Sequence, residues 1–423
     1  MRFMKKRVAI IGSGVAGLTC AWLLREKYDV SLFEANDYAG GHTQTTDVEV
    51  NGTTWPVNTG FIVYNDWTYP NFIRLMDLLG VKSEESDMSF SVKCEQSGLE
   101  YNGHTLNTLF AQRRNIFKPA FWGMIRDILK FNKETREELA NDSVDQTETL
   151  GSYLQRKGYG EVFRTKYIIP MGAAVWSASE EMMMQFPVYF FLRFFNNHGM
   201  LSVDERPQWR VISNGSRSYV ARILEDLPQD QVHLNTPIDG VSRSKDGVIV
   251  SSHRGHEHFD EVIFACHSDQ ALGMLKDATD DEKNILGAIP YKMNDVVLHT
   301  DHKILPQRRL AWAAWNYHIG EQSQDSVAVT YYMNRLQNFD DAPVDFCVTL
   351  NKTEAINPDK IIRQFRYAHP VFTLEGMAAQ QRHSEISGKN HSHFCGAYWF
   401  NGFHEDGVRS ALRVTEALGV PLP

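Results

Sequence analysis

The fold of this chain is decided by residues 8–17, which have the sequence VAIIGSGVAG. Val8–Ile11 form an unbroken apolar run rich in β-branched residues, which is typical of a buried parallel strand. A GxGxxG glycine pattern follows at once, and the segment Leu18–Lys27 then predicts a helix. A second strand is expected over Val30–Phe33, and it ends at the acid Glu34. This order predicts a dinucleotide-binding βαβ unit.

Each part of the unit has a mechanical reason. Gly12 allows the tight turn, Gly14 lets a pyrophosphate approach the backbone, and Gly17 lets helix and strand pack closely. The unpaired N–H groups at the start of the helix then face the phosphates. Glu34 is expected to accept hydrogen bonds from ribose hydroxyls, which favours a cofactor without a 2′-phosphate and leaves NAD and FAD both open. The other predicted cofactor contacts of this unit are Ser13, Ala16 and Ala35.

Composition narrows the class of protein. The chain has 423 residues, of which 43% are hydrophobic and 22% are charged, so it is expected to fold into two or three compact domains. The 43 Lys and Arg residues against 52 Asp and Glu residues give a net charge of -9, which argues against nucleic acid as a partner. The five cysteines lie far apart, which predicts a reducing compartment without disulfides.

A membrane span, a signal peptide and a metal site are not expected. No apolar run reaches the 18 or so residues of a membrane helix, and Gly12-Ser13-Gly14 interrupts the apolar N-terminal stretch. We therefore predict a cytoplasmic protein. His253, His256 and His258 are expected in a polar hairpin turn without nearby cysteines, so no metal ion is predicted.

The residues after Glu34 identify a superfamily. Residues 34–43, EANDYAGGHT, resemble the flavin-containing amine oxidases, in which a Gly-Gly-Arg turn lies under the diphosphate and flavin. Here His42 stands in place of the arginine, so a fixed cation is not implied. The resemblance implies FAD, with contacts from Gly41, His42, Thr43, Gly60 and Phe61.

Two later segments also resemble this superfamily. Residues 232–266 predict short strands joined by turns, one of them the polar turn at 253–258, and they match the β-meander of the FAD-binding domain. In relatives, the backbone at the position of Ile238 touches the adenine. The last segment predicts a strand ending at residues 394–396 and a helix over residues 402–418.

In relatives, the N-terminus of this last helix points at the flavin pyrimidine ring. Its N–H groups would stabilise negative charge on reduced flavin, and the implied contacts are Asp406, Gly407 and Val408. His404 and Glu405 are the candidate proton acceptor, since they start the same helix. No residue suggests a covalent anchor, so FAD is expected to be non-covalent.

These segments predict an α/β fold with a glutathione-reductase-like, FAD-binding Rossmann domain and an inserted α+β substrate domain. The FAD-binding domain is expected to be discontinuous, over residues 1–75, 205–290 and 385–423. Residues 76–204 and 291–384 would form the substrate domain.

Several longer runs resemble one bacterial branch of the superfamily, whose members are encoded near cyclopropane-fatty-acid synthase. The runs are 56–65, 86–92, 109–115, 194–199, 329–337 and 394–399. A related flavoprotein is implicated in desaturating methyl-branched phospholipid acyl chains on the way to furan fatty acids. The resemblance implies an FAD-dependent oxidoreductase that transfers a hydride to flavin N5 from a fatty acyl chain carried by a phospholipid.

Three other functions stay open. The first is an amine or amino-acid oxidase, although Asn294 or Asp295 takes the register of the usual lysine and Lys292 falls outside it. The second is a redox-neutral flavin isomerase or an accessory protein of lipid metabolism. The third is an NAD-only dehydrogenase, which the C-terminal flavin motif opposes.

Residues 110–131 carry five basic side chains and one acidic side chain, against the overall sign of the chain. An interfacial segment that meets anionic phospholipid has this makeup, which predicts peripheral association with the inner membrane surface. A surface helix packed on its own domain is the alternative.

Overall fold

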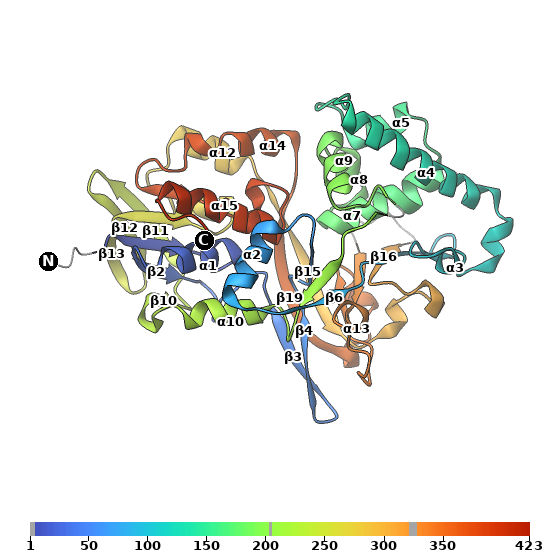
Figure 1. Cartoon of the computed structure of the whole chain (residues 1–423), viewed down its shortest axis with the longest axis horizontal. Helices are drawn as coiled ribbons and strands as arrows, with labels where there is room; N and C mark the ends of the chain where they lie inside the picture. The colour runs from blue at the N-terminus through green and yellow to red at the C-terminus, as the bar shows by residue number, and fades with distance from the viewer. Residues whose placement is uncertain (1–4, 203–204, 321–327) are drawn as a thin grey trace.

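The computed structural model describes residues 5–202, 205–320 and 328–423, and Figure 1 shows two lobes. One lobe is built on a five-stranded parallel sheet with the order β10-β2-β1-β14-β20. Its strands are β1 Arg7–Ile11, β2 Asp29–Phe33, β10 Val232–His233, β14 Glu261–Phe264 and β20 Ser392–Phe394. The predicted α/β fold with a Rossmann-like parallel sheet is confirmed.

Two helices from opposite ends of the chain cover one face of this sheet. All ten residues of α1 (Val15–Leu24) are buried, and α15 (His404–Ala417) packs against α1. Figure 1 shows the two helices side by side. Cys20 Sγ in α1 lies 3.9 Å from Cys395 Sγ, just after β20. The flanking helices are α2 (Pro70–Leu79) and α10 (Arg217–Glu225).

The opposite face carries an antiparallel three-stranded meander of β11 (Ile238–Ser244), β12 (Gly247–Ser252) and β13 (Gly255–Phe259). The predicted polar turn at 253–258 is wrong in part, because β13 includes His256 and His258. This edge strand is polar and largely exposed, so its composition is that of a turn. The segment 261–264 belongs to the parallel sheet. The helices on this side are α11 Ser268–Met274, α12 Asp280–Gly287 and α14 Leu374–Gln381.

The second lobe holds a seven-stranded mixed sheet with the order β19-β15-β18-β17-β16-β7-β8. Its longest pair is antiparallel, β15 (Tyr291–His299) with β19 (Ile361–Pro370), and these two strands face the first lobe. The other strands are β7 Phe90–Cys94, β8 Leu99–Asn102, β16 Trp315–Ile319, β17 Ala328–Tyr332 and β18 Cys347–Leu350. Two small sheets join the lobes: β3 Thr45–Val50 with β4 Thr53–Asn58, and β5 Val63–Asn65, β9 Trp209–Ile212 and β6 Ser83–Ser86.

Helices between β8 and β9 form the outer layer of the second lobe. They are α3 Leu106–Leu109, the 3-10 turn η1 Arg113–Phe117, α4 Pro119–Ala140, α5 Leu150–Arg156, α6 Glu161–Phe163, the π-helical turn η2 Arg164–Ile168, α7 Ile169–Trp176, α8 Glu180–Met184 and α9 Val188–Asn197. Buried aromatic side chains such as Phe163, Phe191 and Phe195 pack between them. Among the described residues, no helix combines the length and the apolar character that are needed to span a bilayer.

Strands of the parallel sheet come from the three segments predicted for the cofactor domain. The sheet of β5, β9 and β6, however, combines residues from both sides of the boundaries expected near 75 and 205. The boundaries of the domains therefore stay a prediction.

Candidate functional site

The glycine-rich turn between β1 and α1 has the geometry of an anion site. Gly12 has φ +103°, and a Cβ there would lie 2.8 Å from Ala265 O, so only glycine fits. A Cβ on Gly17 would lie 1.9 Å from Gly12 O, so position 17 also requires glycine. No side chain caps the N-terminus of α1, and a Cβ added to Gly14 would meet no described atom within 4 Å. The start of α1 therefore has open space beside Gly14 and amides that no side chain caps.

Glu34 directly follows β2, lies beside this turn and is 7% exposed. Its Oε2 accepts hydrogen bonds from Ser13 N–H at 3.0 Å and Ser13 Oγ–H at 2.5 Å, and its Oε1 accepts one from Asn36 N–H at 2.9 Å. The Thr236 N–H donates to the Glu34 carbonyl, which brings the chain leading into Ile238 next to the acid. Ala35 follows on the surface, and Ala16 is buried in the first turn of α1. The carboxylate thus lies where a ribose is expected.

A second glycine turn lies against the first. Gly40 N–H donates to Ser13 O, and Gly41 has φ +57° with its missing Cβ only 3.1 Å from Gly14 Cα. Gly60 supports this turn from behind, because a Cβ there would lie 2.0 Å from His42 O, and Phe61 N–H donates to that carbonyl at 2.8 Å. Both turns therefore bring backbone close to the same space at the start of α1.

The C-terminal helix reaches this place as well. A Cβ on Gly407 would lie 2.5 Å from Val15 Cγ1, and Val408 beside it is fully buried. The Gly407 N–H already donates to Phe403 O within the helix, so the amides that a ligand can reach belong to the residues before it. The N-termini of α1 and α15 thus meet, as the sequence predicts. They can approach this closely because Gly407 has no side chain.

These features fit a dinucleotide whose diphosphate meets the start of α1. The cradle is made of backbone and glycine, with open space at Gly14, and it contains no fixed cation among the described residues. His42 adds a buried Nε2 that has no hydrogen-bond partner within the described chain. An unpaired buried nitrogen of this kind is costly, so a bound group that satisfies it is expected.

Around His42 lie three residues that the sequence analysis missed: His267, Tyr367 and His369. Their ring centroids are 6.1, 5.0 and 5.4 Å from that of His42. The signal available in the sequence is the alternation in β19, where Phe365, Tyr367 and His369 occupy one face of the strand. The aromatic cluster connects the cofactor cradle to the second lobe.

The histidines of this region are held neutral. Burial lowers the pKa of His42 well below its ordinary value, and the neighbouring His369 and His267 lower it further. Burial lowers the pKa of His369 to about 4 and also lowers the pKa of His267. A neutral His42 supplies a hydrogen-bonding group in place of the arginine of the resembling proteins, without its charge.

His404, one predicted proton acceptor, is enclosed by protein. Its ring stacks on Phe61 with centroids 3.5 Å apart, and its Nε2 lies 2.9 Å from Thr43 Oγ1 and 3.2 Å from Tyr219 OH. Burial lowers the pKa of His404 to about 3, so the ring is a weak base. These contacts favour a positioning role for His404 and Thr43, and the catalytic assignment stays a prediction.

Glu405, the other predicted acceptor, binds the start of α2. Its carboxylate accepts hydrogen bonds from Asn71 Nδ2 at 2.6 Å, Asn71 N–H at 3.3 Å and Phe72 N–H at 2.9 Å. Two of these donors are amides of the first turn of α2, which have no partner within their own helix. Glu405 therefore caps α2 and ties it to α15.

Asp406 faces the start of its own helix. Its carboxylate accepts hydrogen bonds from Phe403 N–H at 3.0 Å and Asn401 Nδ2 at 3.4 Å. Burial raises the pKa of Asp406 to about 7, and the carboxylate of Glu405 adds to the rise, although the bond from Phe403 opposes it. Asp406 is therefore a buried acid that changes charge near neutral pH.

A cavity of about 340 Å³ lies between the helical layer and the β15–β19 pair. His369 lines it and also contacts His42, so the cavity adjoins the cofactor cradle. Most of the other lining side chains are aromatic or aliphatic: Trp176, Ala178, Met182, Phe186, Pro370, Val371, Phe372 and Leu374. A ligand that adjoins the cofactor here would meet an apolar wall.

The polar wall of the cavity comes from β15 and β19. Lys292 lies opposite His369 in the strand register and lines the cavity with it. Asn294, on the same face, is fully buried, and its Nδ2 lies 3.2 Å from His369 Nδ1. Asp295 points to the outer face, where it pairs with Arg366 at 3.4 Å. Of the two residues considered for the lysine register, only Asn294 thus faces the interior.

Comparison with known proteins agrees with this architecture. The model of the family described as flavin containing amine oxidoreductase matches residues 15–308. A curated 1-hydroxycarotenoid 3,4-desaturase from Flavobacterium sp. (strain P99-3) is 62% identical over 37 residues, a match that spans only 8% of each chain.

Two solved structures are similar over nearly the whole chain. Cyclohexylamine oxidase from Brevibacterium oxydans IH-35A is similar over 98% of both chains, with a TM-score of 0.69 and 14% identity. A CLA-producing fatty acid isomerase from P. acnes is similar over 97% of this chain and 98% of its own, with a TM-score of 0.69 and 15% identity. At such identity the likeness shows the fold alone.

Proposed function

The chain belongs to the flavin containing amine oxidoreductase family and is an FAD-dependent oxidoreductase, and we propose that its substrate is a fatty acyl chain. The proposed reaction is dehydrogenation of a methyl-branched or otherwise modified chain carried by a phospholipid. The branch encoded near cyclopropane-fatty-acid synthase, which the long sequence runs resemble, is part of this proposal.

FAD, when bound, would supply the two-electron acceptor that dehydrogenation of the substrate requires. The residues of the chain hold the cofactor and position the substrate. The amides at the start of α1 would bind the diphosphate, Glu34 would bind the ribose, and the start of α15 would provide N–H groups for negative charge. The apolar walls of the cavity exclude water from the reacting carbon.

The apolar lining of the cavity beside His42 is the observation that carries the acyl proposal. Trp176 and Phe186 have ring centroids 4.5 Å apart, and Phe372 lies 6.4 Å from Phe186. Hydrocarbon gains free energy when it leaves water for such a surface, at roughly 25 cal/mol per Å² buried. An acyl chain is therefore the ligand class that matches most of the wall.

Charge in the cavity argues against an amine. Lys292 is the basic residue of the strand wall. The acidic residue of the cavity lining is Glu181, and it is exposed at the surface. A buried carboxylate that would pair with an ammonium is not among the described lining residues.

The proteins found by comparison support both lipid chemistry and its alternative. A carotenoid desaturase and a fatty acid isomerase act on hydrocarbon chains by their names, and cyclohexylamine oxidase acts on an amine by its name. The isomerase favours one second candidate for this chain, which is a redox-neutral rearrangement of an acyl chain.

Anaerobic titration of the flavin separates these functions. Purified holoprotein is mixed without oxygen with methyl-branched phospholipid, with its unbranched counterpart, or with a panel of amines, and the flavin absorbance is followed. We expect the branched lipid to bleach the flavin and the amines to leave it oxidised. Bleaching by amines alone would overturn the proposal. Conversion of the lipid without net transfer of electrons from the lipid to the flavin would establish the isomerase instead.

A further inference from the structure

We infer that the surface formed by α3, η1 and the first half of α4 is a docking face for anionic lipid bilayers. It deepens the proposed function by naming the source of the acyl chain, and its test is independent of turnover. We call this surface the lipid face, and it consists of the exposed residues in 106–130 together with 308–310.

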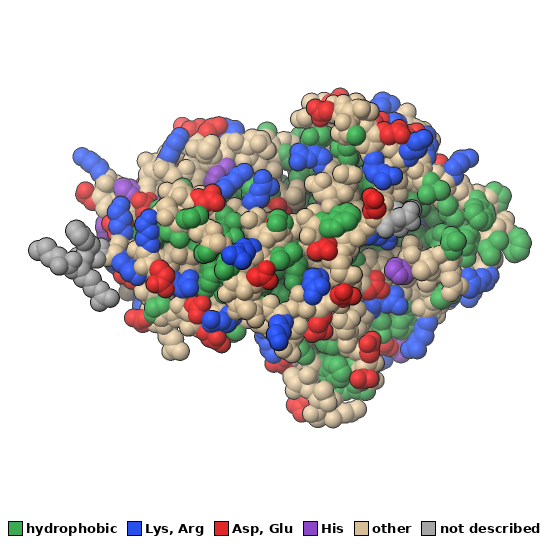
Figure 2. Space-filling model, viewed as in Figure 1, with side chains coloured by type: hydrophobic (Ala, Val, Ile, Leu, Met, Phe, Trp, Pro, Cys, Tyr) green, Lys and Arg blue, Asp and Glu red, His purple; other side chains and the backbone are tan. Residues whose placement is uncertain are grey.

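Exposed apolar side chains gather on the lipid face. Of the eleven large hydrophobic side chains exposed in the described chain, six belong to it. They are Leu106, Ile116, Phe117, Trp122, Leu129 and Leu310, and Phe117 is 86% exposed. Figure 2 shows hydrophobic side chains grouped at the end of the molecule that α3 and the start of α4 form in Figure 1. Exposed apolar groups that cluster in this way mark an interaction site.

Cations surround these apolar groups. Arg113, Arg114, Lys118 and Arg126 are exposed in the same stretch, and Arg308 and Arg309 join them because the turn Arg309–Ala311 contacts α3. Asp127, the acid of residues 104–130, is 8% exposed, pairs with Arg126 at 3.7 Å and accepts a hydrogen bond from Gly160 N–H. No ion pair with Arg113, Arg114 or Lys118 is formed within the described residues.

The mixture of charge and apolar surface identifies the partner. Trp122 and Leu129 lie seven residues apart and so share one face of α4, with Arg126 between them. An apolar side chain that enters the acyl boundary beside a cation that meets a lipid phosphate is the interfacial pattern. Since the whole chain has a net charge of -9, this local excess of cations would also orient the molecule toward an anionic surface.

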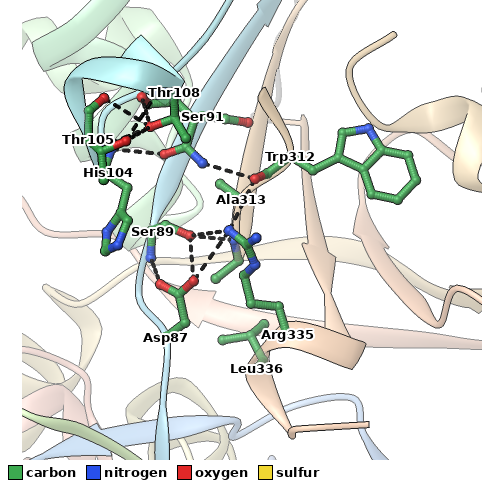
Figure 3. A network of polar contacts seen from close by, with 12 residues as sticks. Asp87, Ser89, Ser91, His104, Thr105, Thr108, Trp312, Ala313, Arg335 and Leu336 are labelled. Atoms are coloured by element: carbon green, nitrogen blue, oxygen red, sulfur yellow. Dashed lines mark hydrogen bonds and ion pairs between the residues drawn. The ribbon is translucent and has the colours of Figure 1, made fainter. Parts of the chain in front are cut away.

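The lipid face is held in shape before any contact with a membrane. Trp122 Nε1–H donates to Ile116 O at 2.8 Å, which fixes the turn that presents Phe117. The polar network in Figure 3 anchors the start of α3: Asn102 Nδ2 donates to Trp312 O at 2.9 Å, and His104 N–H donates to Asn102 Oδ1. Arg335 extends it, with Nη1 3.2 Å from Trp312 O. Hydrogen bonds therefore tie both the start of α3 and the turn before Phe117 to neighbouring groups.

The helical layer connects this face to the cavity. α4 contacts α9 and α6, and Phe186, Trp176 and Met182 from the same layer line the cavity beside His369. A protein docked through α3 and α4 would bring this layer against the bilayer that contains the acyl chains.

Sedimentation of the holoprotein with vesicles tests the inference. We expect binding to phosphatidylglycerol-containing vesicles and not to pure phosphatidylcholine, with loss of binding at high salt. Phe117→Ser with Trp122→Ser, and separately Arg113→Gln with Arg114→Gln, should each weaken binding about tenfold. The matched controls are Ile249→Ser for an exposed apolar residue and Lys283→Gln with Arg366→Gln for exposed cations, and these should bind as the wild type does.

Three outcomes overturn the inference. The first is that the protein does not bind anionic vesicles at low salt. The second is that variants of the lipid face bind as well as the controls do. The third is that the protein self-associates without lipid and that variants of the lipid face abolish this self-association. Retained flavin absorbance shows that each variant is folded. Vesicle binding by a protein whose flavin no phospholipid reduces would leave docking intact and overturn the proposed function alone.

Discussion

Single residues decide which cofactor atoms this chain recognises, and Glu34 is the clearest case. Its two oxygens accept hydrogen bonds from both donors of Ser13 and from Asn36, so the carboxylate is already oriented before a ribose arrives. Preorientation of this kind lowers the entropic cost of binding.

Glu34→Gln should raise the Kd for FAD about ten- to a hundredfold, because a hydrogen bond to a charged group contributes about 1.5–3 kcal/mol. Titration of the apoprotein followed by flavin fluorescence measures this change. Asp37→Asn is the control, since it removes the same charge from an exposed position in the same loop. An unchanged Kd in Glu34→Gln would show that the carboxylate does not contact the ribose.

The raised pKa of Asp406, to about 7, predicts how stability depends on pH. The acid is protonated more readily in the folded state than at its ordinary value of 3.8, so folding is stabilised below about pH 4. This stabilisation is lost as pH rises toward 7, by an amount on the order of 2–4 kcal/mol.

Asp406→Asn should abolish that dependence, because the amide is neutral throughout and can still accept from Phe403 N–H. Chemical unfolding of the holoprotein at saturating FAD, between pH 4 and pH 8, measures the free energy of unfolding. A variant that loses stability with pH as steeply as the wild type would contradict the assignment.

At the scale of helices, the contact between α1 and α15 depends on Gly407. An added methyl group there would lie 2.5 Å from Val15 Cγ1, so the Val15 side chain or one of the two helices must shift. Gly407→Ala should therefore lower FAD affinity about tenfold or more and destabilise the protein by about 1–3 kcal/mol. Gly273→Ala in α11 is the matched control, since a Cβ there would meet no described atom within 4 Å. Equal flavin retention by both variants would show that the two helices need not touch.

The cap that Glu405 places on α2 makes a second prediction for helices. Glu405→Gln should loosen the first turn of α2, at a cost of about 1–2 kcal/mol, because two backbone amides lose a charged acceptor. Hydrogen exchange over residues 70–79 should rise in this variant. Glu416→Gln, an exposed change on the same helix, should leave exchange as it is in the wild type. Normal exchange together with slow flavin reduction would instead favour Glu405 as the proton acceptor.

Local patterns were enough to predict the elements around the cradle. The strand at 7–11, its glycine turn and the last helix each carry their signal within about twenty residues. No single short segment predicts the His42 cluster, because its members come from distant parts of the chain; β15 and β19, for example, bring Asn294 and His369 together across 75 residues. The exposure of Phe117 was equally hidden, since a phenylalanine between apolar neighbours is expected inside.

For the whole molecule, the two ends of the chain converge on one cradle and the middle supplies the wall that faces it. The parallel sheet takes strands from both ends, and β19 places His369 against His42 from the second lobe. FAD should therefore act as a link between the segments, so that its removal lowers the stability of both lobes.

The most direct test is a crystal structure of the FAD-loaded protein with a long-chain phospholipid analogue. The account predicts the diphosphate at the start of α1, the flavin between His42 and the start of α15, and the acyl chain in the cavity lined by Trp176, Phe186 and Phe372. Flavin bound away from either helix, or an acyl chain excluded from that cavity, would contradict it.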